Sequence, residues 1–287
     1  MRNFDERNIT DAVIERFKNT PDPRLKAIMN SLVKHLHDFV RDVELTTDEW
    51  NFAIDFLTRT GQMCSRVRQE FILLSDTLGV SMLVDAVNHR MPEGATQTTV
   101  LGPFYVENPP EFPLGADVSR NLKGEKLFVG GTVSSAGGGP LAGAVIDIWQ
   151  SDTDGYYDVQ RTDLSEPTLR GRLRADAEGR FHFWTILPSP YPIPHDGPVG
   201  QMLEATARQP WRPAHLHFMV SATGHEKLVT HVFVKGDKYL DSDAVFGVKR
   251  SLIREYTREQ PGVAPDGTKM NGPWRKLNYD FGLKRWG

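Results

Sequence analysis

Two histidines, His215 and His217, stand two positions apart in a run that otherwise has the composition of a buried strand. Side chains two apart on a strand point to the same face, so the two imidazoles would offer nitrogen ligands to one point. Leu216 and Phe218 would then face a core on the other side. The pattern predicts half of a metal site. A lone His-x-His is also compatible with two hydrogen-bonded histidines on a polar sheet face.

Two further observations favour the metal site. Arg212 and Pro213 come just before the histidines, so a fixed cation and a rigid turn of chain lead into the site. Tyr157 and Tyr191 lie upstream in loop-like sequence rather than in a core pattern. Loops on a rigid scaffold commonly carry binding groups, and each tyrosine is also compatible with an ordinary loop residue.

Three motifs resemble those of one enzyme family. The run Arg-Pro-Ala-His-Leu-His, residues 212–217, resembles the iron-binding strand of the intradiol ring-cleaving dioxygenases, the catechol and hydroxyquinol 1,2-dioxygenases. Gly155-Tyr156-Tyr157 is similar to the family's first tyrosine motif, and Thr-Ile-Leu-Pro-Ser-Pro-Tyr, residues 185–191, to its second. The motifs occur in the family's order, and the resemblance extends over nearly the whole chain.

The resemblance implies one Fe(III) per chain, held by Tyr157, Tyr191, His215 and His217. Phenolate oxygen is a hard ligand that favours ferric iron. Tyr156 competes with Tyr157 for the first position, and Tyr157 is preferred because the family's ligand is the second residue after Gly155. Arg212 is implied to stabilise negative charge that develops on the substrate ring. His231 departs from the catechol branch, which usually has Gln at this position, and we expect it to hydrogen-bond beside the iron without binding it. Salt bridging is the ordinary alternative for Arg212.

The resemblance also implies a reaction. A 1,2-diol binds the iron through both oxygens, Tyr191 accepts a proton, and both atoms of O2 end in a ring-opened diacid. We expect the substrate to be hydroxyquinol (benzene-1,2,4-triol), giving 3-hydroxy-cis,cis-muconate or its tautomer maleylacetate in the catabolism of aromatic compounds. Catechol or chlorocatechol, giving cis,cis-muconates, is the alternative. A non-catalytic β-sandwich that binds a metal or lipid is the alternative of another class.

A substrate pocket follows from the same resemblance. Its predicted lining is Leu73, Asp76, Val100, Leu101, Gly102, Pro103, Phe104, Ile193, Pro194, Arg212 and Val245. Leu-Gly-Pro-Phe at 101–104 resembles the hydroxyquinol branch, whereas the catechol branch commonly has Glu-Gly-Pro-Leu. Asp76 is expected to accept a hydrogen bond from the third hydroxyl, which catechol lacks. Without the resemblance, Leu73 would be interpreted as a core residue and Asp76 as a helix-end cap or a solvated charge. Residues 100–104 would be interpreted as a hydrophobic plug between the two domains.

Composition excludes several classes of partner. The chain has 287 residues, a formal net charge of −3 and a pI near 6.3, so no basic face for nucleic acid is expected. The first residues contain acids and no apolar leader, and no later run approaches the length of a membrane span. We therefore expect a cytoplasmic protein.

The fold is predicted to be mainly β, with a β-sandwich catalytic domain and an N-terminal α-helical dimerisation domain. The boundary is placed in a Pro- and Gly-dense stretch, giving 1–95 as the helical part and 96–287 as the β part with the iron site. Helices are expected from Pro23 and from Thr46, then at about 65–74 and 81–88. Expected strands are 127–133, 144–150, 170–174, 181–186, 215–221, 228–234 and about 249–258.

The expected helices carry wide apolar stripes at three- and four-residue steps, Leu25 to Val43 being the longest. Such stripes serve either packing among the helices or an interface with a second copy. The resemblance implies a homodimer formed through these helices, with an apolar tunnel that holds phospholipid.

Overall fold

The computed structural model describes residues 3–65, 68–120 and 122–286. Within it the chain forms two compact units, residues 1–62 and 63–287. The segment 63–95, predicted to belong with the helices, is therefore part of the unit that contains the sheets. The predicted boundary between residues 95 and 96 does not coincide with the boundary between the compact units. It remains a prediction about which residues form the dimer and which carry catalysis.

The first unit is helical. It contains α1 (Ile9–Arg16), α2 (Pro23–Asp42) and α3 (Thr47–Gln62). The side chain of Asp22 caps α2 by accepting from the amides of Arg24 and Leu25, as its sequence predicts. A reciprocal capping box precedes α3: the Thr46 amide donates to the Glu49 carboxylate at 2.9 Å, and the Glu49 amide donates to the Thr46 hydroxyl at 3.3 Å.

The apolar stripes of this unit are exposed in the single chain. Val33 is the buried side chain that α2 contributes. The exposed apolar side chains on α2, at its C-cap Val43 and on α3 are Leu25, Ile28, Leu32, Leu36, Phe39, Val40, Val43, Trp50, Phe52, Ile54 and Leu57. None of the helices in the described part of the chain is both long and apolar enough to cross a membrane. A continuous exposed apolar surface of this kind is characteristic of a surface that binds a partner.

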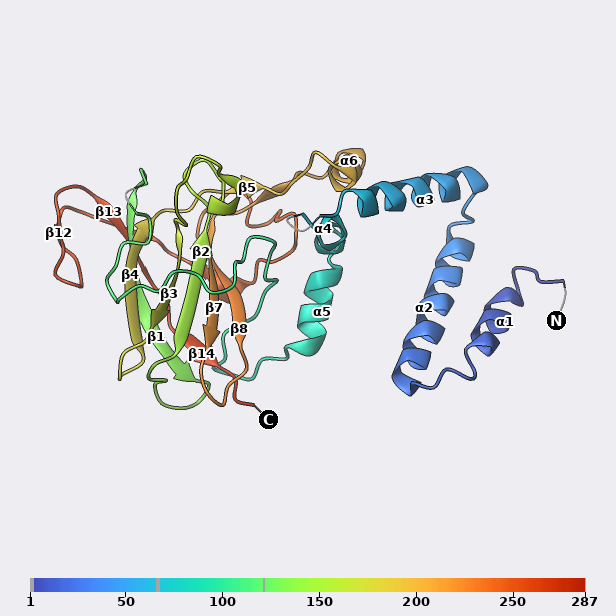
Figure 1. The fold of residues 1–287 in the computed structure, drawn as a ribbon, viewed down its shortest axis with the longest axis horizontal. Helices are drawn as coiled ribbons and strands as arrows, with labels where there is room; N and C mark the ends of the chain where they lie inside the picture. Colours follow the sequence, from blue (N-terminus) through green and yellow to red (C-terminus); the bar gives the residue numbers. More distant parts are fainter. Residues whose placement is uncertain (1–2, 66–67, 121, 287) are drawn as a thin grey trace. The chain divides into compact units, whose positions relative to one another are not determined.

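The second unit is built on two five-stranded sheets (Figure 1). One has the order β10-β13-β1-β14, with β4 also paired to β1, and the other the order β3-β2-β7-β8-β9. The strands of the first sheet are β1 (Lys126–Ser135), β4 (Arg180–Ile186), β10 (Thr257–Glu259), β13 (Trp274–Asn278) and β14 (Phe281–Leu283). Those of the second are β2 (Val145–Gln150), β3 (Arg170–Arg174), β7 (His215–Ser221), β8 (Leu228–Val234) and β9 (Ile253–Arg254).

Shorter elements surround the sheets. They are α4 (Glu70–Thr77), α5 (Val80–Asn88), α6 (Pro198–Ala205), the 3-10 turns Asp158–Gln160 and Arg250–Leu252, and the two-residue strands β5 (Tyr191–Pro192), β6 (Trp211–Arg212), β11 (Gly262–Val263) and β12 (Lys269–Met270). The predicted strand at 249–258 is wrong as one element. That segment leaves the second sheet after β9 and enters the first sheet at β10, so it cannot pair along its whole length.

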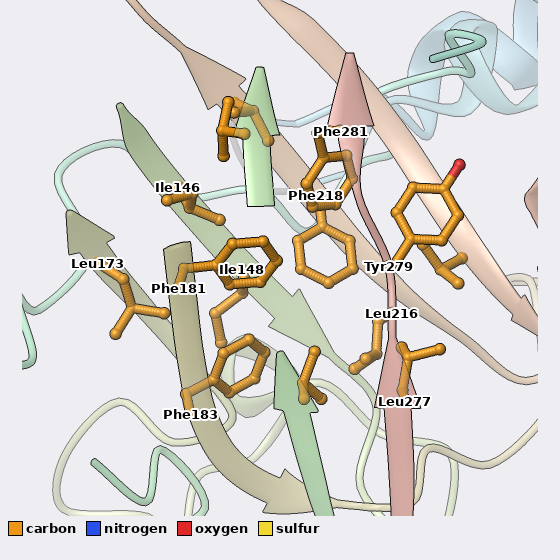
Figure 2. Packing of buried hydrophobic residues seen from close by; sticks show 14 of the residues in the cluster. Ile146, Ile148, Leu173, Phe181, Phe183, Leu216, Phe218, Leu277, Tyr279 and Phe281 are labelled. Atoms are coloured by element: carbon orange, nitrogen blue, oxygen red, sulfur yellow. The ribbon is translucent and has the colours of Figure 1, made fainter. Parts of the chain in front are cut away.

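The core lies between the two sheets (Figure 2). Phe181 and Phe183 of β4 enter it from one sheet, and Leu216 and Phe218 of β7 enter it from the other. Alternate residues of β7 therefore face inward, which turns His215 and His217 to the outer face. A slip of one residue would put both imidazoles into the core, so burial of these apolar side chains fixes the orientation of the histidines.

Gly131 of β1 and Gly139, which follows β1, should differ in how much stability the protein loses when each is replaced by alanine. A Cβ at Gly131 of β1 would overlap the backbone carbonyl of Tyr279, whereas a Cβ at Gly139 would meet nothing within 4 Å. Gly131→Ala should therefore lower the free energy of unfolding by about 1–3 kcal/mol or more, because overpacking against backbone cannot relax by a rotamer change. Gly139→Ala is the control and should change it little. Urea denaturation measures both, and equal effects would contradict this packing.

Candidate active site

A row of side chains crosses four neighbouring strands on the outer face of the second sheet. Arg170 of β3 is paired with Trp149 of β2, Trp149 with His217 of β7, and His217 with His231 of β8. The Trp149 and His217 rings stack with centroids 4.7 Å apart and planes 18° apart. His231 lies on the other side of His217, with ring centroids 4.2 Å apart. Strand register thus fixes the His217 ring between two aromatic neighbours.

His215 joins His217 and His231 in a buried cluster whose nitrogen atoms lie within 4.8 Å of one another. Nδ1 of His215 lies 2.6 Å from the carbonyl oxygen of Pro213, which can only accept, so Nδ1 carries the proton. The neutral ring then presents its lone pair at Nε2, which lies 3.0 Å from Nε2 of His217 and 3.5 Å from Nη1 of Arg212. Two imidazole nitrogens therefore converge, and one is held in the tautomer that a metal requires.

The two tyrosines lie against these imidazoles. The Tyr157 hydroxyl is 2.7 Å from Nε2 of His217, and the Tyr157 and Tyr191 rings are 5.2 Å apart, edge to face. Tyr157 is fully buried, whereas its neighbour Tyr156 is 51% exposed. Gly155, at a φ of +86°, would place a Cβ only 3.1 Å from that of Tyr191. The glycine therefore lets the two tyrosine loops approach each other.

Burial sets the protonation of this group. It lowers the pKa of His215 to about 3, with the nearby charge of Arg212 acting in the same direction. Burial also holds the pKa values of His217 and His231 well below the usual value, so all three imidazoles are neutral at pH 7. Burial raises the pKa of the Tyr157 phenol well above 10, and Tyr191 adds to this shift. A buried phenol of this kind ionises only when a strong cation is bound beside it.

Arg212 lies between the tyrosines and the histidines and forms a buried ion pair with Asp243. It pairs with Tyr191 across β5 and β6, and its Nη1 lies 3.4 Å from the Tyr191 hydroxyl. Its Nε donates to Oδ1 of Asp243 at 3.0 Å, and both side chains are almost fully buried. Burial opposes the positive charge, but Asp243, with further contributions from Tyr191 and Tyr157, more than offsets this and raises the Arg212 pKa. The guanidinium is a fixed cation beside the converging donors.

Asp243 also folds the turn that holds this arginine. Its carboxylate accepts from the amides of Val245 at 3.4 Å and Gly247 at 2.9 Å. A Cβ at Gly247 would lie 2.9 Å from Nη2 of Arg212, so only glycine leaves room for the guanidinium. Nη2 of Arg212 lies 3.4 Å from Nδ1 of His231. An arginine nitrogen only donates, so Nδ1 of His231 accepts and its lone pair faces Arg212.

Part of the predicted pocket segment lies directly against this site. A Cβ at Gly102 would be 3.5 Å from Cε1 of His217. The Phe104 ring stacks on Tyr157 with centroids 4.3 Å apart, and the backbone of Val100 interacts with the His231 ring. Leu101 and Pro103, between them, are exposed. The segment alternates between residues that contact the donors and residues that face outward.

The remaining predicted pocket residues come from α4, the Asp243 turn and the segment that follows β5. Asp76 and Leu73 are buried on α4, and Asp76 lies within electrostatic range of Arg212. Val245 is buried on the Asp243 turn, Ile193 is buried and Pro194 is half-buried. The contribution of these residues and of the 100–104 segment to a substrate pocket remains a prediction.

Arg208 ties α4 to the Asp243 turn. Its Nη1 donates to the carbonyl of Thr77 at 2.6 Å, and its Nη2 donates to the carbonyl of Ala244 at 3.1 Å. Thr77 directly follows Asp76, and Ala244 directly precedes Val245. One guanidinium therefore sets the spacing between two predicted pocket walls.

Comparisons with known proteins agree with this geometry. Residues 100–285 match a family profile described as Dioxygenase, and residues 22–96 match one described as Catechol dioxygenase N terminus. A 6-chlorohydroxyquinol 1,2-dioxygenase from Cupriavidus pinatubonensis is 58% identical over 99% of each chain. The chain belongs to the intradiol ring-cleaving dioxygenases.

Other relatives extend this similarity to structure. A hydroxyquinol 1,2-dioxygenase from Rhodococcus opacus is 50% identical, over 97% of this chain and 93% of that protein. A crystal structure of a hydroxyquinol 1,2-dioxygenase from Pseudomonas putida is 51% identical, with a TM-score of 0.93 over 98% of this chain and 99% of that chain. The mainly β fold with N-terminal helices is confirmed for this dioxygenase.

Three residues of the dioxygenase site were not predicted from the sequence: Trp149, Arg170 and Asp243. Trp149 and Arg170 lie on strands that were predicted, and their place beside His217 follows from strand pairing, which the sequence does not give. Asp243 is separated from Arg212 by 31 positions. Asp243 lies two positions before Val245, a predicted pocket residue, and this closeness in sequence was the one indication that it could belong to the site.

Asp76 of the dioxygenase predicts a pH-dependent change in stability. Burial raises the pKa of its carboxyl, so the ionised form lowers the free energy of unfolding at pH 7. Asp76→Asn should therefore be more stable than the parent at pH 7. The difference should shrink as the pH falls toward about 4, the ordinary aspartate pKa, because the parent is then protonated in both folded and unfolded states.

Thermal unfolding of the iron-free protein between pH 4 and 7 measures this difference. Asp154→Asn, which changes an exposed aspartate, is the control and should show no such trend. An Asp76→Asn variant that is less stable at pH 7 would show that favourable interactions of the carboxylate outweigh its burial.

Proposed function

We propose that the chain cleaves hydroxyquinol with O2, giving 3-hydroxy-cis,cis-muconate or maleylacetate. The observation that carries this choice is Asp76, a buried carboxylate within electrostatic range of Arg212. Burial of this carboxylate is only partly offset by a hydrogen bond from Ser81 and by the charge of Arg212, so a bound ligand that donates a further hydrogen bond would lower the remaining cost. Hydroxyquinol has a third hydroxyl that can donate, and catechol does not. The hydroxyquinol names of relatives at 50% and 58% identity support the same choice.

We propose that Tyr157, Tyr191, His215 and His217 hold one Fe(III) per chain. The donor set fits this ion: two imidazoles kept neutral by burial and two phenol oxygens, which as phenolates would offset most of its charge. When bound, the iron would act as a Lewis acid that activates the diol for attack by O2.

The protein groups divide the remaining work in this proposal. Tyr191, beside Arg212, accepts a proton from the diol. Arg212 stabilises negative charge that develops on the ring, because its ion pair with Asp243 keeps it charged and fixed without covering Nη1. Phe104 and Trp149 stack on Tyr157 and His217, which keeps water away from these donors. His231 supports the site without binding the iron.

A second candidate substrate is 6-chlorohydroxyquinol. The relative at 58% identity carries that name, and the chlorinated triol retains the hydroxyl that Asp76 would recognise. Catechol or chlorocatechol remains the alternative substrate, although neither has a third hydroxyl that could donate a hydrogen bond to Asp76.

We propose that the helical part, residues 1–95, forms a homodimer, and that residues 96–287 carry catalysis. The exposed apolar stripes of α2 and α3 support this, since water-exposed stripes of that size favour association. Phospholipid at this interface and a cytoplasmic location remain predictions.

The iron site is tested by replacing one hydroxyl. Tyr157→Phe should abolish hydroxyquinol cleavage, lower the iron content and remove or shift the visible tyrosinate-to-iron absorption band. Tyr156→Phe is the matched control, because it removes the neighbouring hydroxyl from an exposed ring. Visible spectra, iron analysis and O2 consumption give the three readings. If Tyr157→Phe keeps its iron, band and turnover, the proposed site is wrong.

The substrate choice is tested at Asp76. Asp76→Asn should reduce kcat/KM for hydroxyquinol about tenfold, because a buried hydrogen bond to a charged acceptor becomes a weaker one to a neutral amide oxygen, while catechol cleavage changes little. Asp154→Asn serves as the control at an exposed aspartate. O2 consumption with each substrate gives the ratio of kcat/KM values. An equal loss of kcat/KM for hydroxyquinol and catechol would show that Asp76 does not recognise the third hydroxyl.

A further inference from the structure

Arg170 lies at the end of the row that contains the active-site imidazoles, on the same face of the sheet. Its side chain is only 3% exposed although it is charged. Burying a guanidinium is costly unless its donors are all engaged, so its partners should indicate what it does. The family resemblance assigned it no role.

All three nitrogens of the Arg170 guanidinium have partners near Tyr157. Nε donates to Oδ2 of Asp158 at 2.7 Å, and Nη2 donates to Oδ1 of the same carboxylate. Nη1 donates to the backbone carbonyl of Phe104 at 3.0 Å. This is a bidentate fork on one segment and a single bond to another, a geometry that lysine cannot reproduce.

The two segments are those that enclose the Tyr157 ring. Asp158 directly follows Tyr157 in the chain, and its carboxylate is 7% exposed. Phe104 lies on the predicted pocket segment, and its ring stacks on Tyr157 with centroids 4.3 Å and planes 21° apart. Phe104 also meets Tyr191 edge to face at 6.2 Å. One guanidinium therefore holds both the backbone that carries Tyr157 and the ring that covers it.

We propose that Arg170 is a positioning residue that fixes the Tyr157 donor and the Phe104 wall in one geometry through Asp158 and the Phe104 carbonyl. This inference rests on the proposed iron site. It assigns Arg170 no contact with the substrate. Its effect is on where the phenol oxygen stands relative to His217 and on how closely Phe104 covers it.

Stability alone does not account for this arrangement. Replacing a buried ion pair by apolar residues of similar size is often neutral or stabilising, so such a pair is weak support for a purely structural role. Three donors aimed at two separate segments specify a position, which an apolar replacement would not do. The double variant Arg170→Met with Asp158→Leu therefore separates the two roles, since it can keep the fold while losing the fork.

The experiment compares Arg170→Lys, Asp158→Asn and the double variant with the parent. We expect each to shift or broaden the tyrosinate-to-iron band and to weaken iron binding by the iron-free protein roughly 10–100-fold, as is usual when a group that orients a ligand is lost. KM for hydroxyquinol should rise as Phe104 loosens. The double variant should show these changes while its thermal unfolding stays near that of the parent.

Arg275→Lys is the matched control. Arg275 of β13 has the same kinds of partner, the Glu125 carboxylate at 3.1 Å and the Tyr256 carbonyl at 3.0 Å, but belongs to the first sheet. It should leave the band and the iron affinity unchanged. Folded Arg170 and Asp158 variants with the parent's band and iron affinity would overturn the positioning role alone. A parent protein with no band after ferric iron is supplied would overturn the iron site and this inference with it.

Discussion

The strand β7 is buried on both faces, and the rest of the site depends on that constraint. Leu216 and Phe218 fill the core between the sheets, so His215 and His217 must face outward together. Because β7 is paired on both sides, its neighbours bring Trp149 and His231 alongside the same imidazole. The core thus determines which side chains meet outside it. A binding site built on a central strand inherits the rigidity of the core.

Burial gives the site its electrostatic character as well. The imidazoles are neutral because charge on them would be desolvated. The positive charges around them belong to two arginines, each neutralised by its own aspartate: Arg212 by Asp243 and Arg170 by Asp158. These pairs allow fixed cations to stand near an ion of the same sign. Without the carboxylates, two uncompensated cations would oppose binding of the iron that we propose for this site.

Spacing alone predicted that His215 and His217 share one face of a strand, whereas the roles of Tyr157, Tyr191 and Arg212 were predicted from the resemblance to the family motifs. Six of the seven predicted strands formed, since alternation and turn residues mark them locally. The segment 249–258 failed because it changes sheets, and α6 was missed because its eight residues, rich in Gly and Pro at the start, carry too short a period. Partners such as Asp243 and Asp158 depend on strand pairing and loop paths, which no local pattern encodes.

The histidines that we propose as iron ligands and the residues predicted to line the substrate pocket lie on different elements, which allows the pocket to change independently of the ligands. His215 and His217 lie on a strand, whereas the predicted wall residues come from the 100–104 segment, α4 and the Asp243 turn. Arginines join these walls: Arg208 bonds α4 to the turn, and Arg170 bonds the 100–104 segment to the Tyr157 loop. A change of wall residue can therefore alter which diol is accepted while the two histidines keep their strand positions. A change at either arginine acts on two elements at once, so its effects on binding and chemistry should not separate.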